Sequence, residues 1–411
     1  MLIAGEASGD LLAAELVAAL RGRWSDANFF GAGGSRMSAA GVQLVHEMSQ
    51  LSVVGVTDVL VRLVELRRLM RKLLAAAIQR QPEVIIGVDY GGFNLRFGHA
   101  VKEYVRNNPF SQWKPKIVQF VSPQVWASRP GRAQRLAQDY DLLLSIFPFE
   151  KDWYAQRVPQ LRVEFVGHPM VGRFADDDLQ FARREPGIAS GLHHPPQILL
   201  LPGSRKSELR RHLPPMLDAL KAIQDKFPSA QTKMILPGDQ LLPVVDWEIA
   251  RRLNTMVRQA SPAGSPTLAG TRSFAQKCFP NLELQIGNLP KALAQADLAI
   301  AKTGTVTMEC AFFSVPAVTL YKGSWLNYQI ARHLITVKTF TMPNLLANEE
   351  VYPEFLQNEL TAENLAGAAL DLLQNEARRQ KIKSQLARVV ASLGAPGAPK
   401  RAADAILSLL E

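Results

Sequence analysis

The chain has 411 residues, of which 47% are hydrophobic, and a formal net charge of +10 at pH 7. This length favours two domains, and the composition is typical of a globular chain with a substantial core. The apolar runs are too short to span a membrane, and Glu6 and Asp10 interrupt the N-terminal apolar stretch. Neither a membrane-spanning helix nor a secretory signal is therefore predicted.

Cysteine and histidine usage indicates a reducing compartment. Cys278 and Cys310 are too few for a disulfide framework, and neither belongs to a C-x-x-C motif. The seven histidines include no H-x-x-x-H pair. We therefore expect a cytoplasmic protein that uses neither a metal ion nor a cofactor.

The positive charge is mostly dispersed along the chain. Nucleic-acid-binding proteins usually concentrate lysine and arginine on one element, with aromatic residues between them. The dense basic segment here is 62–72, in which four arginines and one lysine accompany the single acid Glu65. A nucleic-acid partner is disfavoured, and an anionic membrane surface is a candidate partner for this segment.

Short apolar strands alternate with helical patterns, which predicts an α/β fold with parallel sheets. In the first half, helices such as 11–23 and 66–80 separate expected strands at 2–4, 28–31, 84–88, 117–121, 142–146 and 163–166. In the second half, a helix is expected at 208–225, and strands are expected at 198–201, 233–236, 282–286, 298–301 and 317–320. This rhythm predicts two doubly wound domains that face each other across a cleft, with ligands at the carboxyl ends of the strands.

The expected linker is 168–196, which is rich in Pro, Gly, His and Asp and lacks periodicity. We place the domain boundary there, with an N-terminal domain at 1–170 and a C-terminal domain at 171–397. A last helix is expected at 401–410, and the segment 398–411 is expected to pack back on the first domain.

The turn 5–10 follows the first strand and precedes a helical pattern. A strand, a glycine-bracketed turn and a helix N-terminus direct backbone N–H groups and a helix dipole at one place. Glu6 adds a carboxylate and Ser8 a hydroxyl, which suits a ligand rich in hydroxyl groups. Ser8 or Asp10 could equally serve only as a helix cap.

A basic amphipathic pattern covers 58–74. Its apolar positions at helical spacing are Val59, Leu63, Leu66, Met70 and Leu73. Most such helices cover a core, but a basic one can also lie in a membrane interface and contact acyl chains. Both interpretations remain open.

Two later strands of the first half end in candidate site residues. Asp89 follows the strand 84–88 beside small residues, where a carboxylate can take a proton from a sugar hydroxyl. Its alternative is to cap the segment that follows. Trp126 comes after the next strand, and it could stack on a sugar face or pack in the core.

The second half contains two turns suited to phosphate. Gly203, Ser204 and Arg205 combine close backbone approach, a hydroxyl and a planar cation. The alternative is an ordinary turn with a surface arginine.

The other turn holds Thr303, Gly304 and Thr305 after the strand 298–301. Glu309, one helical turn later, can accept from both hydroxyls of a ribose, or it can be a solvated helix residue. Two such turns in one domain predict a bound nucleoside diphosphate.

Eight ordered segments give the chain a resemblance to the lipid-A-disaccharide synthase family over nearly its full length: 5–10, 87–94, 121–127, 147–151, 166–169, 201–205, 304–309 and 343–347. The resemblance implies an inverting glycosyltransferase of the GT-B fold that needs no metal. It implies UDP-2,3-diacylglucosamine as donor and 2,3-diacylglucosamine 1-phosphate as acceptor, a β-1,6 bond and release of UDP. It also implies a peripheral location on the cytoplasmic face of the inner membrane of Gram-negative bacteria.

By this resemblance, Asp89 is the base that deprotonates the acceptor 6-hydroxyl, and a single displacement needs one base. Arg205 and Glu309 match donor-site residues, while Glu6 and Asn344 match residues implicated in activity.

The cation and turn residues of the donor site would then replace a divalent ion. Arg205, Thr303 and the N–H groups around Gly304 would stabilise the charge that develops on UDP.

The chain departs from the family pattern in two places. Residues 90–92 read Tyr-Gly-Gly where many members have Ala-Pro-Asp, so a second carboxylate is absent and a mechanism that needs a carboxylate pair is disfavoured. Residues 126–128 read Trp-Ala-Ser in place of Trp-Ala-Trp.

Two rival functions stay open. One is another UDP-sugar enzyme of the same fold, such as the lipid II-forming transferase or a UDP-sugar epimerase. The other is a peripheral membrane protein that binds a nucleotide sugar without catalysis. The oligomeric state is also open, with a homodimer as one option.

Overall fold

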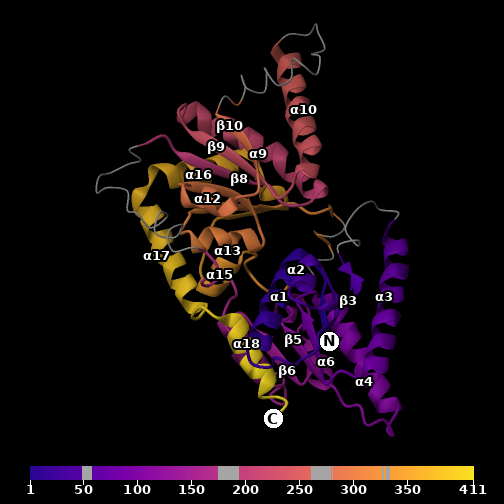
Figure 1. Cartoon of the computed structure of the whole chain (residues 1–411). Helices are drawn as coiled ribbons and strands as arrows, with labels where there is room; N and C mark the ends of the chain where they lie inside the picture. Colours follow the sequence, from indigo (N-terminus) through magenta and orange to yellow (C-terminus); the bar gives the residue numbers. More distant parts are fainter. Residues whose placement is uncertain (49–57, 175–193, 261–278, 280, 326–327, 330–333) are drawn as a thin grey trace. The chain divides into compact units, whose positions relative to one another are not determined.

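The computed structural model describes residues 1–48, 58–174, 194–260, 279, 281–325, 328–329 and 334–411, with backbone only for 58–63 and 253–260. The chain divides into two compact units (Figure 1): Met1–Arg173 together with Leu393–Glu411, and Phe174–Ser392. Each unit is a parallel sheet covered by helices. Most of the expected linker, 175–193, lies outside the described residues.

The first unit contains a seven-stranded sheet with the order β3-β2-β1-β4-β5-β6-β7. Its strands are β1 (Leu2–Ala4), β2 (Phe30–Gly33), β3 (Gln43–Glu47), β4 (Val84–Val88), β5 (Lys116–Phe120), β6 (Leu142–Ser145) and β7 (Val163–Phe165). The strand order reverses between β1 and β4, which pair in parallel with Leu2 opposite Ile86. Such a reversal opens a crevice at the carboxyl ends of the two strands, where ligands bind. Gly5 and Asp89 are the residues that follow these two strands.

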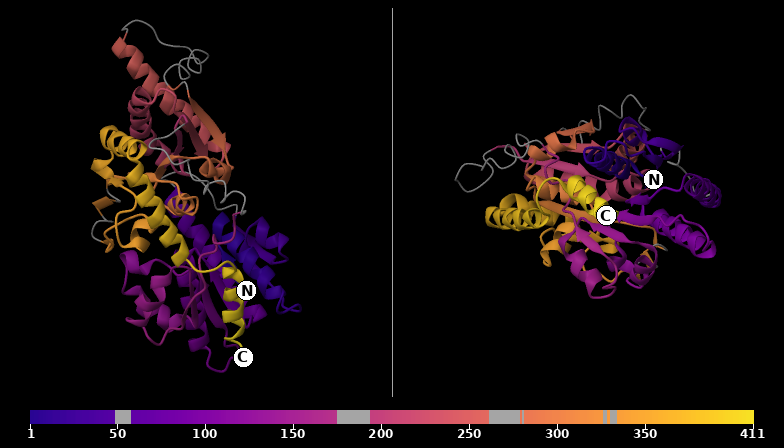
Figure 2. Two further views of the ribbon diagram at one scale, coloured as in Figure 1. Left: turned by 90° about the vertical axis from the view of Figure 1, so that its left-hand side faces the viewer. Right: turned by 60° about the horizontal axis from the view of Figure 1, so that its bottom comes forward.

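The helices of this unit are α1 (Ala7–Arg21), α2 (Ser35–Ala39), α3 (Asp58–Arg80), α4 (Gly91–Asn107), α5 (Val125–Ser128), α6 (Arg132–Asp139), α7 (Pro148–Ala155) and α18 (Ala398–Leu407). The C-terminal helix α18 packs against α1, as Figure 2 shows in yellow near the N-terminus. Arg401 Nε also donates to the carbonyl oxygen of Val166 at 2.8 Å. The last helix of the chain is therefore part of the first unit.

The second unit repeats this topology with the order β10-β9-β8-β11-β12-β13. Its strands are β8 (Gln197–Leu201), β9 (Gln231–Leu236), β10 (Leu282–Ile286), β11 (Leu298–Lys302), β12 (Ala317–Tyr321) and β13 (Glu354–Leu356). Here the order reverses between β8 and β11, which pair with Leu298 opposite Ile198. Pro202 and Thr303 follow these strands, so both predicted phosphate turns lie at the reversal point.

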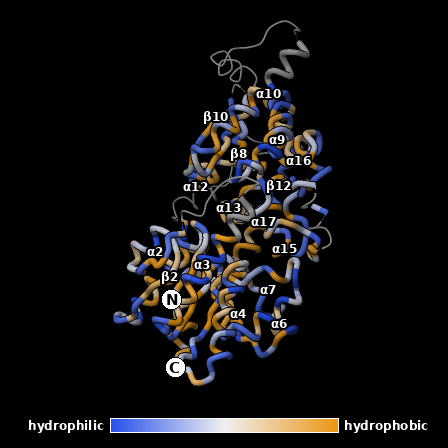
Figure 3. The backbone as a smooth tube through the Cα atoms, turned by 90° about the vertical axis from the view of Figure 1, so that its right-hand side faces the viewer, coloured by the Kyte–Doolittle hydropathy of each residue, from blue (hydrophilic) through white to orange (hydrophobic). Residues whose placement is uncertain are grey.

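The helices of the second unit are α9 (Lys206–Lys226), α10 (Leu242–Ala260), α12 (Leu289–Ala294), α13 (Thr305–Phe312), α15 (Met342–Ala347), α16 (Ala362–Gln374) and α17 (Glu376–Ser392), with short 3₁₀ turns at Asp239–Leu241 and Gln357–Glu359. The two central strands are continuous apolar runs, typical of strands buried on both faces. In Figure 3, hydrophobic segments run through the middle of each unit. No helix in the described part of the chain is long and apolar enough to cross a bilayer.

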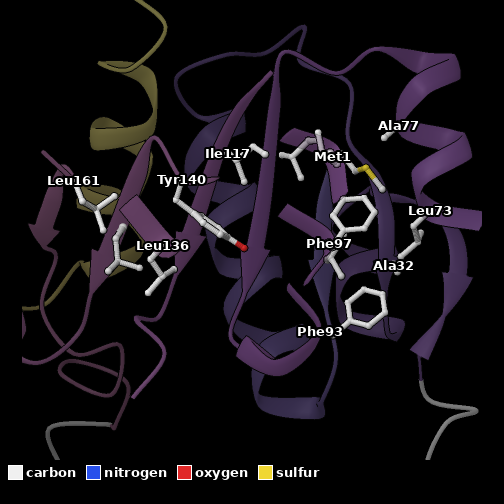
Figure 4. Close-up of a cluster of buried hydrophobic side chains, with 14 of the residues drawn as sticks. Met1, Ala32, Leu73, Ala77, Phe93, Phe97, Ile117, Leu136, Tyr140 and Leu161 are labelled. Atoms are coloured by element: carbon white, nitrogen blue, oxygen red, sulfur yellow. The ribbon is translucent and has the colours of Figure 1, made fainter. Parts of the chain in front are cut away.

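Side chains from the sheet and from α3, α4 and α6 form the core of the first unit (Figure 4). Phe97 and Ile117 are 1% exposed, and Leu73 is fully buried. Tyr140 lies among them, and its hydroxyl donates to the carbonyl oxygen of Asn94 at 2.7 Å. The start of α4, which follows Asp89, is thereby anchored in the core.

The structure differs from the sequence expectations in several elements, and the largest shift of a helix start is that of α3, which begins at Asp58 rather than at 66. The strands β3 and β13 were not expected; each lies at one edge of its sheet, is partly exposed and contains charged residues. Edge strands need no continuous apolar run, which explains the omission. The helix α1 begins at Ala7, four residues before its expected start, so the turn 5–10 is largely helical.

Candidate active site

Two glycines bring the N-terminus of α1 against the end of β4. A Cβ on Gly5 would collide with the ring of Tyr90, and one on Gly9 would lie 3.4 Å from the carbonyl oxygen of Val88. Glu6 precedes α1 and Ser8 lies in its first turn; both are exposed, and no side chain caps the helix. The first turn therefore offers its N–H groups to a ligand beside Asp89.

Asp10 resolves one of the alternatives for the turn 5–10. Its carboxylate is buried and accepts from the backbone N–H groups of Gly34 at 2.7 Å, Arg36 at 3.0 Å and Met37 at 3.1 Å. These donors belong to the start of α2. Asp10 is therefore a cap, but of the neighbouring helix rather than of its own.

Asp89 lies in a strained turn. Its φ is +50° and that of Tyr90 is +46°, a left-handed conformation that non-glycine residues rarely adopt. The Asp89 carbonyl oxygen accepts from Asn94 Nδ2 at 2.8 Å and from Gln119 Nε2 at 2.9 Å, and both amides are buried. Two amide side chains thus hold the strained residue in place, and strain of this kind concentrates at functional sites.

The environment of Asp89 favours a proton acceptor. Burial raises the pKa of its carboxyl above the usual range, a hydrogen bond from the Tyr90 N–H opposes this, and the negative charge of Glu6 raises the pKa further. A carboxylate with a raised pKa binds a proton more readily than an ordinary aspartate does. Asp89 is therefore the candidate proton acceptor, and the charge of Glu6 raises the pKa of Asp89.

Trp126 packs in the core, one of the two options that the sequence left open. It is 6% exposed, and its ring meets Phe149 edge-on with centroids 5.0 Å apart. Its Nε1 donates to Glu150 Oε1 at 2.9 Å. Burial raises the pKa of Glu150 to about 7 against the hydrogen bonds from Trp126 and the Phe147 N–H. The assignment of Trp126 to acceptor stacking is corrected to a packing role.

The membrane-contact assignment in α3 is wrong for Leu73. Leu73 is fully buried in the core, and Leu66 and Met70 pack against that core. Figure 4 shows Leu73 pointing toward Ala32. The side chains of Val59 and Leu63 lie outside the described residues. At 66–73, the apolar stripe of α3 therefore covers the sheet.

Replacing Leu73 by alanine should lower the free energy of unfolding of the first unit by about 2–5 kcal/mol, because it opens a cavity in a packed core. The matched change Val64→Ala, at a residue of the same helix that is 45% exposed, should change it by less than about 0.5 kcal/mol. Urea unfolding of both variants measures the difference. Equal, small effects would contradict the core placement of Leu73.

The first phosphate turn is organised by Glu208 of α9. Gly203 has φ +125°, and a Cβ there would overlap the Glu208 carboxylate. The backbone N–H of Ser204 donates to Glu208 Oε2 at 3.0 Å. Arg205 lies just before α9 with its guanidinium 3.7 Å from Glu208 Oε1 and its side chain 69% exposed. The turn therefore presents its cation to solvent.

The second phosphate turn joins the same carboxylate. Lys302 Nζ lies 3.5 Å from Glu208 Oε1, so cations from two turns approach one acid. Gly304, with φ +146°, precedes α13, and Thr307 Oγ1 donates to its carbonyl oxygen at 2.7 Å. Thr303 is nearly buried and Thr305 is exposed, whereas Glu309 is half-buried on α13. A helix N-terminus beside Lys302 is a suitable site for an anion.

A buried histidine ties these loops together. His212 is fully buried; its Nδ1–H donates to the carbonyl oxygen of Pro202 at 2.7 Å, and its Nε2 accepts from the Lys322 N–H at 3.1 Å. Burial lowers the pKa of His212, so the neutral ring is favoured, and only the neutral ring makes both bonds. His212 therefore links the carboxyl ends of β8 and β12.

Asn344 is a structural residue in this conformation. It is 1% exposed, and its Nδ2 donates to the Tyr352 carbonyl oxygen and to Glu354 Oε1, each at 2.8 Å. Its Oδ1 accepts from the N–H groups of Val351 and Tyr352. These bonds use the donors and acceptors of the amide in full. In this conformation Asn344 holds 351–354, and its link to activity stays a prediction.

Comparison with known proteins decides the family. A family model described as lipid-A-disaccharide synthetase matches residues 1–243 and 248–407. The chain belongs to the lipid-A-disaccharide synthase family. Lipid-A-disaccharide synthases from Myxococcus xanthus, over 411 residues, and Alcanivorax borkumensis, over 414, are each 34% identical to it; the alignments cover 100% of this chain and 97% of each relative.

Solved structures support the fold of the chain. UDP-GlcNAc 2-epimerase from Neisseria meningitidis, bound to UDP-GlcNAc, superposes with a TM-score of 0.58 at 10% identity, covering 99% of both chains. The kitacinnamycin glycosyltransferase superposes with a TM-score of 0.54 at 16% identity, covering 99% of this chain and 98% of the other. These likenesses show the GT-B fold, which transferases and epimerases share. Family membership decides between them, and the chain is a glycosyltransferase of the lipid A pathway.

Four residues that support the candidate site were not predicted from the sequence. Asn94 and Gln119 hold Asp89, and Glu208 and His212 organise the phosphate turns. Glu208 and His212 lie on the predicted helix 208–225, and their i, i+4 spacing was the only signal that they share a face. Among the described residues, no group of histidine, cysteine, aspartate or glutamate side chains has the arrangement of a metal site.

Proposed function

We propose that this member of the lipid-A-disaccharide synthase family transfers 2,3-diacylglucosamine from UDP-2,3-diacylglucosamine to the 6-hydroxyl of 2,3-diacylglucosamine 1-phosphate. The observation that carries the proposal is the chemistry at the two strand-order reversals. A carboxylate with a raised pKa follows β4 in the first unit, and cations with helix N-termini follow β8 and β11 in the second. Acceptor activation and leaving-group stabilisation are therefore assigned to different units.

In this mechanism Asp89 accepts the proton of the acceptor 6-hydroxyl as that oxygen attacks the anomeric carbon of the donor. The bond from that carbon to the UDP oxygen breaks as the β-1,6 bond forms, so one displacement inverts the centre with a single base. The proton then passes from Asp89 to solvent. Glu6 supports this step by raising the pKa of Asp89, and Ser8 and the first turn of α1 bind acceptor hydroxyls.

The second unit binds the donor. Gly203, Ser204 and Arg205 contact the diphosphate from one turn, and Thr303, Gly304 and Thr305 contact it from the other, while Glu309 accepts from the ribose hydroxyls. The leaving UDP gains negative charge, which Arg205, Lys302 and the N-terminus of α13 stabilise without rearrangement. Glu208 contacts both phosphate turns and His212 contacts the first of them, so these two residues fix the positions of the turns.

The acyl chains of both substrates require a membrane surface. In α3, Arg67, Arg68, Arg71 and Lys72 are exposed, although the apolar stripe at 66–73 is turned inward. Each cation near an anionic bilayer is worth about 1 kcal/mol, which supports peripheral binding to the cytoplasmic face of the inner membrane through charge.

The experiment that tests the function uses the purified chain with donor and acceptor in detergent micelles. We expect UDP and a disaccharide of the summed mass to appear in equal amounts, and neither to appear when either substrate is left out. Release of UDP at the full rate without acceptor, or an epimerised donor, would contradict the proposal.

A further inference from the structure

A basic pocket in the first unit has no part in the mechanism above. It has a volume of about 230 Å³ and lies where α4 and α6 pack side by side (Figure 1). Its charged and titratable lining includes Arg96, His99, Arg129, Arg132, Arg135 and Asp139. Four arginines thus come together around one cavity from three segments of the chain.

These arginines have no counter-ion in the described part of the chain. None of the four forms an ion pair there, whereas Asp139 already binds Arg106 NH2 and His99 Nδ1, each at 2.8 Å. Burial and the charges of Arg129, Arg96 and Arg135 lower the pKa of Arg132. All four arginines are exposed, so an anion that enters the pocket from solvent meets several positive charges at once.

The pocket lies close to Asp89. Gly92 forms part of its wall and is three residues from Asp89, so their Cα atoms are at most about 11 Å apart. A Cβ on Gly92 would meet nothing within 4 Å, so the wall is open there. Gly92 also belongs to the first turn of α4, whose N-terminus favours negative charge. The pocket is therefore next to the turn that holds Asp89.

We propose that this pocket binds a phosphate monoester, and that the ligand is the anomeric phosphate of the acceptor. The inference rests on the proposed function, because that acceptor carries its 1-phosphate and its reacting 6-hydroxyl on one pyranose ring. Guanidinium groups pair with phosphate oxygens through two parallel hydrogen bonds, which suits a doubly charged monoester. The pocket then orients the ring, with the 6-hydroxyl toward Asp89. The phosphate of a membrane phospholipid is the other source of the same chemistry.

The test compares Arg96→Gln/Arg132→Gln with a control of equal charge change, Arg23→Gln/Arg162→Gln. The control residues form exposed ion pairs with Asp404 and Glu164 in the same unit. In detergent micelles we expect the pocket variant to raise KM for the phosphorylated acceptor at least tenfold, with KM for the donor unchanged. For an acceptor without the phosphate, wild type, pocket variant and control should have the same KM. An unchanged KM for the phosphorylated acceptor would overturn the assignment.

Two further measurements distinguish the acceptor phosphate from a lipid phosphate, and they distinguish phosphate binding from the proposed transfer reaction. Calorimetric titration with glucosamine 1-phosphate needs no turnover; wild type and control should bind it and the pocket variant should not, even if the proposed transfer itself failed. Cosedimentation with phosphatidylglycerol vesicles, against phosphatidylcholine vesicles, tests the lipid headgroup. If the variant lost vesicle binding but kept its acceptor KM, the ligand would be a phospholipid and the acceptor assignment would be overturned.

Discussion

Replacing Asp89 by asparagine should lower kcat about 10²–10⁴-fold, the range expected for loss of a general base. Asparagine has the same shape, and it tolerates the left-handed backbone that this position requires. The substitution therefore removes the proton acceptor without straining the turn. UDP release at saturating donor and acceptor measures the effect. A variant that keeps more than about a tenth of the wild-type rate would show that Asp89 is not the base.

The pH dependence of stability provides the folding control for this variant. Burial raises the pKa of Asp89 in the folded chain, so its contribution to stability is fully present below the unfolded pKa and is lost as pH rises through the folded value. At pH 7 the buried charge is therefore a cost that asparagine removes. We expect Asp89→Asn to unfold at the same or a higher temperature than wild type at pH 7, with the difference shrinking in acid. An inactive variant that unfolds earlier at pH 7 would indicate structural damage instead.

Replacing Arg205 by glutamine should lower kcat about 10²–10³-fold, because it removes a cation that stabilises the leaving UDP. The matched control is Arg210→Gln, at an exposed arginine of α9, the helix that Arg205 precedes, and it should leave kcat within twofold. Steady-state kinetics with varied donor separates the two kinds of effect. If the substitution raised only KM for the donor and left kcat unchanged, Arg205 would stabilise the bound donor and the transition state of the transfer equally. The role assigned to Arg205 in the transition state would then be wrong.

Much of the fold was predictable because its central strands are apolar runs of the right length. The expected strand at 84–88, which is central in its sheet, has the bounds that the structure has. The edge strands β3 and β13 carried no comparable signal, since half-exposed strands are stabilised by pairing with one neighbour. The turn 5–10 was expected to precede its helix, but α1 already begins at Ala7; Gly9 permits close packing on β4, and Asp10 caps α2 rather than its own helix.

The site was predictable where chemistry follows a strand directly. Asp89, Arg205 and Thr303 lie beyond the carboxyl ends of strands, and the general behaviour of doubly wound sheets places ligands there. The supports of these residues depend on contacts distant in sequence. Gln119 reaches Asp89 across 30 positions and His212 reaches Lys322 across 110, and no local pattern encodes such pairs.

The partners of a side chain explain two outcomes. The periodicity of α3 identifies an apolar stripe but does not say what covers it, and the sheet covers Leu73. For Asn344, whose link to activity stays a prediction, the backbone of 351–352 and Glu354 use all of the amide's hydrogen bonds. In both cases the partner of a side chain, rather than its type, decides its role.

In the proposed mechanism one carboxylate, Asp89, deprotonates the acceptor for a single displacement at the anomeric carbon. The anomeric configuration of the disaccharide, read from the proton coupling at the newly linked C1 by NMR, tests this mechanism. We expect a β linkage from the α-linked UDP donor, without a covalent sugar–enzyme species in rapidly quenched samples. An α linkage, or a trapped covalent species, would contradict it.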